Sequence, residues 1–109
     1  MTMMFQLAKI QWRSQQIAFA QQRLMNKTTR SGKVTADDMR KQEKLLAEKK
    51  ALLDELEEMS HTQDQVQRMT AQKLLDQHTP LFQEANSRLE KFKEEFELKD
   101  GYYQRRAIA

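Results

Sequence analysis

The chain's two histidines are the residues that could bind a metal ion. His61 and His78 lie 17 residues apart. Neither has a second histidine or a carboxylate cluster at a recognised ligand spacing, although Asp64 follows His61 by about one helical turn. Exposed or helix-end positions are the better interpretation of both histidines, and we expect no metal site.

Acid–base chemistry would need carboxylates in a pocket that shifts their pKa values. The densest acids, Asp54, Glu55, Glu57 and Glu58, instead belong to a charge-rich run that is typical of a solvated helix face. The sequence also lacks a Gly-rich phosphate loop, a nucleophile elbow and any cysteine. We therefore expect that the protein is not an enzyme and has neither catalytic residues nor a cofactor.

Binding chemistry is indicated more strongly, by three aromatic residues that recur every seven positions. Phe5, Trp12 and Phe19 fall on one side of a predicted helix whose aliphatic residues lie on nearly the opposite side: Met3, Leu7, Ile10, Ile17 and Leu24. A helix with two apolar stripes usually contacts two neighbours. We interpret the aromatic side as a partner interface, and the alternative is that a third helix of the same chain covers it. The predicted interface residues are Met4, Phe5, Trp12, Phe19, Tyr102 and Tyr103.

Basic residues line the sector beside these aromatics, and residues 1–33 contain no acid. They could contact an anion, because cations neutralise phosphates while rings stack on bases, or they could contact an anionic membrane surface. We favour a third interpretation, in which these basic residues pair with acids of the next helix. The density of positive charge is modest, and no nucleic-acid-binding motif accompanies the basic residues. The candidate anion contacts are Lys9, Arg13, Arg23, Lys27 and Arg30.

Composition defines the elements that position these residues. The 109 residues include 32% charged residues, two glycines and one proline, which favours long helices in a single domain. The mean hydropathy of −0.90 favours narrow apolar seams over a large core. No apolar run is long enough to span a membrane, and Lys9 and Arg13 interrupt any signal-peptide core, so we expect a cytoplasmic protein, with leaderless export left open.

Three helices are predicted, over residues 2–28, 36–78 and 80–99, followed by a tail over 101–109. Thr35 caps the second helix, Pro80 restarts the chain as the third, and Gly101 caps the third. The polar residues 60–65 could be a solvated stretch, a bend or a break. We expect an all-α elongated hairpin or three-helix antiparallel bundle with coiled-coil packing. The first helix would fold back on the first half of the second, bringing Lys27 near Asp37, and the third would cover its second half.

These features predict a non-enzymatic protein–protein interaction module. It would be a small coiled-coil structural or adaptor protein that binds a helical partner or self-associates, most simply as a homo-oligomer. No motif identifies a family. In general form the chain is similar to small helical proteins of bacterial export machines and their chaperones, which also lack cysteine and signal peptides. That similarity implies a narrower hypothesis, a leaderless secreted subunit or export chaperone, while nucleic-acid or anionic-surface binding by the basic first helix is the alternative.

Overall fold

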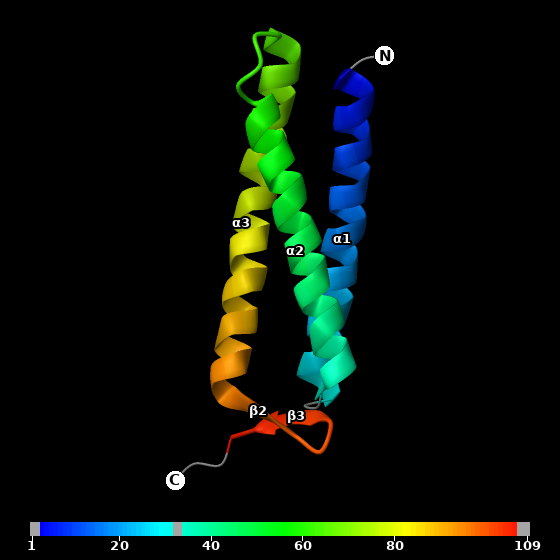
Figure 1. Cartoon of the computed structure of the whole chain (residues 1–109), viewed down its shortest axis with the longest axis vertical. Coiled ribbons are helices and arrows are strands. Elements are labelled where there is room, and N and C mark those ends of the chain that lie inside the picture. The colour runs from blue at the N-terminus through cyan, green and yellow to red at the C-terminus, as the bar shows by residue number, and fades with distance from the viewer. Residues whose placement is uncertain (1–2, 32–33, 107–109) are drawn as a thin grey trace.

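Three long helices lie side by side in the computed structural model of the chain, and a small sheet closes one end (Figure 1). The structure describes residues 3–31 and 34–106. Within these ranges the elements follow in the order α1 (Met3–Ser31), β1 (Val34–Thr35), α2 (Ala36–Met59), α3 (Gln65–Glu95), β2 (Phe96–Lys99) and β3 (Tyr102–Arg105). The molecule is elongated, measuring 57 × 23 × 18 Å.

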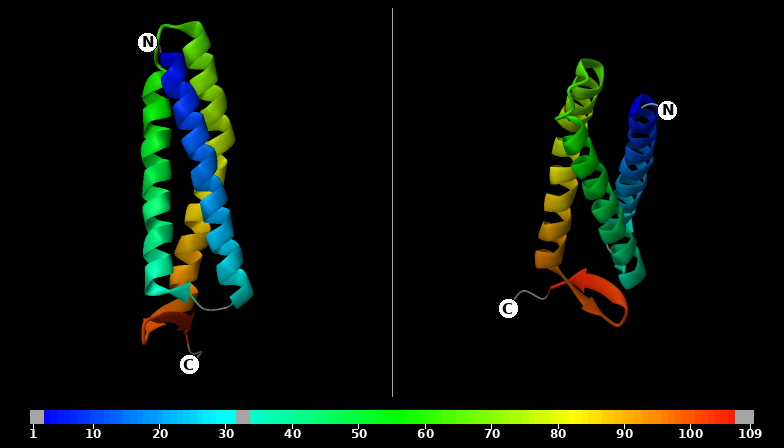
Figure 2. Two further views of the ribbon diagram at one scale, coloured as in Figure 1. Left: turned by 90° about the vertical axis from the view of Figure 1, so that its right-hand side faces the viewer. Right: turned by 45° about the horizontal axis from the view of Figure 1, so that its top comes forward.

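The helices alternate in direction along the chain. Helix α2 runs back along α1, and α3 runs back along α2, so α1 and α3 point the same way (Figures 1 and 2). The start of α1 therefore lies at the end where α2 turns into α3, far from the sheet (Figure 1). The predominantly helical class is confirmed, and the sheet is an addition that the sequence did not predict.

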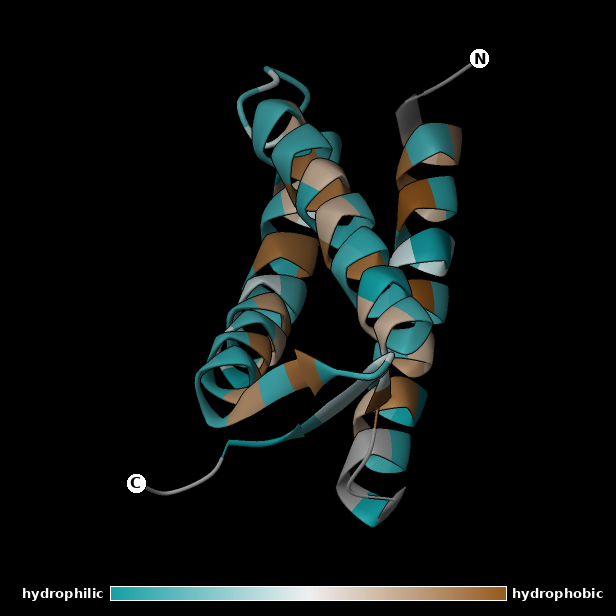
Figure 3. Ribbon diagram, turned by 60° about the horizontal axis from the view of Figure 1, so that its bottom comes forward, coloured by the Kyte–Doolittle hydropathy of each residue, from teal (hydrophilic) through white to brown (hydrophobic). Residues whose placement is uncertain are grey.

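Two apolar clusters hold the helices together. The larger cluster combines the aliphatic side of α1 with leucines of α2 and two residues of α3, and its buried members are Leu7, Ile10, Ile17, Leu52, Leu53, Leu56, Ala71 and Leu74. The smaller one joins Val34, Met39, Leu46 and Leu89 near the sheet. Figure 3 shows apolar residues recurring among polar ones along all three helices. The predicted aliphatic side of α1 is thus the buried side, although the side chain of Met3 is outside the described set.

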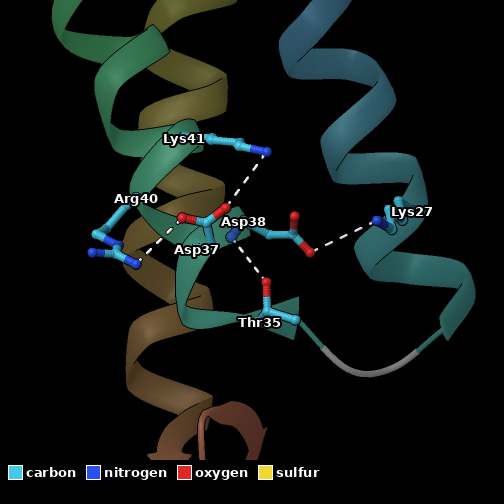
Figure 4. A network of polar contacts seen from close by, with 6 residues as sticks. All are labelled: Lys27, Thr35, Asp37, Asp38, Arg40 and Lys41. Atoms are coloured by element: carbon cyan, nitrogen blue, oxygen red, sulfur yellow. Dashed lines mark hydrogen bonds and ion pairs between the residues drawn. The ribbon is translucent and has the colours of Figure 1, made fainter.

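Helix α2 begins where the sequence predicts. The Oγ1 atom of Thr35 accepts a hydrogen bond from the backbone N–H of Asp38 at 3.0 Å (Figure 4). Asp37 and Asp38 lie in the first turn, where the helix dipole favours negative charge. Val34 and Met39 pack in one cluster on either side of this cap, as a hydrophobic staple does. The predicted turn residue Gly32 lies outside the described residues.

Loss of this cap has a predictable cost. Thr35→Ala is expected to lower the free energy of unfolding by about 1 kcal/mol, because the N–H of Asp38 then loses its acceptor. Urea denaturation followed by circular dichroism measures the change. Thr35→Ser is the matched control, since it keeps the hydroxyl group, and equal losses in both variants would show that the cap contributes nothing.

The polar stretch after Met59 is a true break between two helices. Ser60 ends α2 with its backbone N–H bonded to the carbonyl of Leu56 at 2.9 Å. Asp64 begins α3 by accepting a hydrogen bond from the N–H of Gln67 at 3.1 Å. The short link over residues 60–64 lets α3 return along α2. Of the three alternatives left open by the sequence, the break is the one observed.

The predicted boundary at Thr79 and Pro80 was wrong, because α3 continues through Pro80 to Glu95. Proline lacks the N–H that would bond to the carbonyl of Asp76, four residues earlier. Pro80 is exposed, so water can reach this part of the helix surface. Buried Leu74 and Leu89 hold α3 against its neighbours on both sides of the proline. Tertiary packing therefore outweighs the local preference for a break.

The predicted C-terminal boundary also differs from the structure. Helix α3 ends at Glu95, and β2 and β3 form a hairpin where we expected helix to residue 99 and then a tail from residue 101. Asp100 and Gly101 have φ angles of 55° and 81°, the left-handed values of a two-residue hairpin turn, so Gly101 is a turn residue and not a helix cap. Strand β3 pairs with β1 as well as β2, in the order β1-β3-β2. The residues 107–109 of the predicted tail lie outside the described part.

Candidate interaction surface

The aromatic row, defined as Phe5, Trp12 and Phe19, lies on the outward side of α1. Their exposed fractions are 61%, 63% and 72%. Leu7, Ile10 and Ile17 on the same helix are buried, so the helix turns its aliphatic side inward and its aromatic side outward. No described residue of α3 covers the row, although the sequence left that alternative open. Three large rings on one helix face therefore form an apolar surface in contact with water.

Of the other predicted interface residues, only Met4 lies near the row. Met4 precedes Phe5 and is also exposed. Tyr102 and Tyr103 belong to β3, at the opposite end of the molecule from the start of α1 (Figure 1). Tyr103 is half-buried and packs against Phe92, with ring centroids 5.9 Å apart. The structure thus separates the tyrosines from the row and gives Tyr103 a packing role.

The basic residues of α1 lie beside the row and along the helix beyond it. The Nζ atom of Lys9 lies 5.9 Å from the centre of the Phe5 ring. Arg23, Lys27 and Arg30 surround a shallow hollow at the other end of α1, and Arg13 is exposed. Lys27 pairs with Asp38 at 3.8 Å (Figure 4), one residue from the predicted partner Asp37, which binds Arg40 and Lys41. The predicted pairing of basic residues of α1 with acids of α2 is therefore observed for Lys27.

Two hollows lie between α1 and α2, and their charges differ. The hollow nearer the start of α1 is lined by one cation, Lys9, and two acids, Glu55 and Glu58. The hollow nearer the end of α1 has an apolar floor that includes Leu24 and Leu45. Its charged residues are four cations and one acid, namely Arg23, Lys27, Lys41, Lys44 and Glu48. The seam between these helices is therefore acidic toward one end and basic toward the other.

A buried polar cluster joins all three helices. Lys49 of α2, which is 1% exposed, donates hydrogen bonds from Nζ to the backbone carbonyl of Ser14 at 3.3 Å and to its hydroxyl. The same nitrogen lies 2.9 Å from Nδ1 of His78 on α3. Burial lowers the pKa of Lys49 to about 8. Burial, followed by the charge of Lys49, lowers the pKa of His78 as well.

The Ser14–Lys49 contact has the composition of a nucleophile and its base, yet its position argues against catalysis. Both side chains are 1% exposed, so a substrate could reach them only if the helices separated.

The histidines also do not form part of a metal-binding cluster within the part of the chain that the structure describes. The other histidine, His61, is exposed, and its Nε2 atom lies 3.4 Å from Oε1 of Glu57. Among the described residues, no group of three histidine, cysteine or carboxylate side chains could hold a metal ion. The polar cluster of Ser14, Lys49 and His78 is therefore best understood as part of the core.

Sequence reasoning missed this cluster. It interpreted His78 as an exposed or helix-end residue, whereas His78 is buried in the middle of α3, and it did not single out Lys49. The only usable signal was periodicity, because Lys49 falls between Leu46 and Leu52–Leu53 on the buried side of α2. That signal is weak, since lysine is rarely buried without a carboxylate.

Comparisons with protein-family models, with curated proteins and with solved structures found no match. Over residues 3–31 and 34–106, no helix is long and apolar enough to cross a membrane. The function therefore has to be inferred from the residues of this chain.

Proposed function

We propose that this protein is a non-enzymatic interaction module. In this proposal the helices form an antiparallel bundle with coiled-coil seams that holds α1 in place, and the aromatic row of α1 binds a helical protein or a second copy of the chain. The observation that carries the proposal is the exposure of Phe5, Trp12 and Phe19 at 61%, 63% and 72% on one helix face. A structural or adaptor role follows from such a surface.

The energetics support a binding role for the row. Three rings that are each about two-thirds exposed leave on the order of 400 Å² of aromatic surface in water. Removing that area from water would contribute on the order of 10 kcal/mol before the entropic cost of association. Ala8, Gln15 and Gln16 are uncharged neighbours of Trp12 on the outward side, and the exposed cations Lys9 and Arg13 flank the row. An apolar centre with polar groups at its rim is typical of a protein interface.

Site-specific photo-crosslinking in the cells that produce the protein tests this proposal. A photoreactive benzoylphenylalanine at Phe19 is expected to give crosslinks to a protein, either another chain or a second copy. The same residue at Met69, an exposed apolar position on α3, is the control and is expected to give few. Crosslinks of equal yield at both positions, or none at Phe19, would contradict the proposal.

Trp12→Ala, introduced into the Phe19-labelled chain, is expected to weaken association about thirtyfold, because central aromatic residues supply much of the binding energy at interfaces. Quantifying crosslink yield against protein concentration measures this effect. Lys9→Gln is the matched comparison on the same face and should change association far less. Circular dichroism of each variant controls for folding. A smaller effect for Trp12→Ala than for Lys9→Gln would favour an electrostatic partner.

A second candidate function is binding of nucleic acid or an anionic surface. It is supported by Lys9 above the Phe5 ring and by the hollow that Arg23, Lys27 and Arg30 surround. Such binding would weaken steeply as salt concentration rises. Fluorescence anisotropy with a labelled single strand and a labelled duplex, from low to physiological salt, tests it. Absence of binding at low salt would remove this candidate.

A further inference from the structure

The aromatic row is symmetric about Trp12. Phe5 lies seven residues before it and Phe19 seven residues after it. A twofold axis at Trp12 would therefore bring Phe5 of one chain to the level of Phe19 in another. The row spans about 21 Å, since each helical residue rises about 1.5 Å.

The charges favour an antiparallel arrangement over a parallel one. In parallel pairing, Lys9 and Arg13 of one copy would lie level with the same cations of the other, and no acid of residues 1–33 could compensate them. In antiparallel pairing about Trp12, Lys9 lies level with Gln15 and Arg13 with Gln11. Glutamines can donate and accept hydrogen bonds, so neither cation meets another cation at its own level, and the Arg13 residues of the two copies are offset by two residues, about 3 Å along the axis.

The seam between α1 and α2 is also self-complementary in the antiparallel arrangement. Lys44 lines the basic hollow together with Ala20, and Glu58 lines the more acidic hollow together with Gln6. A twofold axis at Trp12 exchanges the two ends of α1, so the basic hollow of each copy meets the acidic hollow of the other. Each chain would contribute on the order of 400 Å² from the rings, about half of what one partner buries in a standard interface. The two hollows and their rims lie beside the rings and can supply the rest.

We propose that the aromatic row is the interface of an antiparallel dimer, in which a second copy of this chain packs its α1 on α1 about a twofold axis at Trp12. This inference rests on the proposed interaction function and names the partner. A symmetric interface of this kind is isologous, with each copy using the same residues.

The dimer itself is tested by sedimentation equilibrium of the full chain from micromolar to millimolar concentration. We expect a species of twice 13.0 kDa that Trp12→Ala dissociates at least about thirtyfold more readily. A chain that stays monomeric at every concentration would overturn this inference. Crosslinks from Phe19 to a different protein would then still uphold the proposed function, so the two failures are distinguishable.

The direction of pairing is tested by charge exchange at low salt. Lys41→Glu/Lys44→Glu and Glu55→Lys/Glu58→Lys are each expected to weaken the dimer about tenfold, because like charges then meet at the two ends. Their combination in one chain is expected to restore it, since the two ends are again complementary. In a parallel dimer the combined variant would gain nothing over either pair, and that result would overturn the inference.

A distance measurement gives an independent test of direction. The chain has no cysteine, so Asn26→Cys carries a single nitroxide label. Asn26 lies 14 residues after Trp12, and an antiparallel dimer separates the two labels by about 40 Å along α1. Labels at nearly the same level, as in a parallel dimer, would overturn the inference. Binding of monomers to anionic vesicles or single-stranded DNA, lost in Trp12→Ala, would assign the row to those ligands and also overturn it.

Discussion

Replacing Lys49 with methionine is expected to raise the free energy of unfolding at pH 7 by about 1–4 kcal/mol. The ammonium group is 1% exposed, and it contacts Ser14 and His78 with no carboxylate among its hydrogen-bond partners. Transfer of a charge from water into such a site is costly unless an opposite charge compensates it. Methionine has a similar volume and no charge. The hydroxyl of Ser14 can turn to the carbonyl four residues earlier in α1.

The same substitution is expected to change how stability depends on pH. Burial lowers the pKa of Lys49 from 10.5 to about 8, so between these values the unfolded chain keeps a proton that the folded chain has lost. The free energy of unfolding of the parent should therefore rise from about pH 8 to pH 10.5 and stay level, as far as Lys49 is concerned, below pH 8. Lys49→Met lacks this group and should lack that rise.

Urea denaturation at several pH values between 7 and 10.5 measures both effects. Lys50→Met is the matched control, because Lys50 is the neighbouring lysine and is exposed. Lys50→Met should change the free energy of unfolding at pH 7 only slightly, and it should keep the rise in that free energy between about pH 8 and pH 10.5. A less stable Lys49→Met variant at pH 7 would mean that the hydrogen bonds to Ser14 and His78 compensate the buried charge.

Acid is expected to destabilise the protein through His78. Its Nδ1 atom lies 2.9 Å from Nζ of Lys49, so a neutral His78 can accept a hydrogen bond from the ammonium group. A protonated His78 cannot accept it and would place a second positive charge beside the first. Burial and the charge of Lys49 both lower the pKa of His78 below its usual 6.5. The unfolded chain therefore takes up a proton first, and stability falls as the pH drops below about 6.5.

His78→Asn tests the origin of this acid effect. The side-chain oxygen of asparagine can replace Nδ1 as the acceptor, and asparagine does not titrate in this range. The variant should be less stable at pH 7, because it fills less volume, but it should lose much of the decline between pH 7 and pH 5. His61→Asn is the control, since His61 is exposed. If both variants show the same decline as the parent, His78 is not its cause.

Helical class and the start of α2 could be predicted because both depend on local chemistry. Few glycines and prolines, a 3.6-residue apolar period and a capping threonine act within one or two turns. The aromatic row could be predicted for the same reason, since seven-residue spacing puts Phe5, Trp12 and Phe19 on one helix face whatever surrounds the helix. The exposure of the aromatic row could not be determined from the sequence, because it depends on whether α3 lies over the row.

The amino-acid sequence alone thus determined the helical periods, the cap at Thr35 and the opposed aliphatic and aromatic sides of α1. Only the tertiary structure decided that Pro80 lies inside a helix, that residues 96–105 form a hairpin pairing with Val34 and Thr35, and that Lys49 and His78 meet in the core. Each of these depends on residues distant in the chain, whose packing energy outweighs the local preferences of proline, of a helical seam and of a charged side chain.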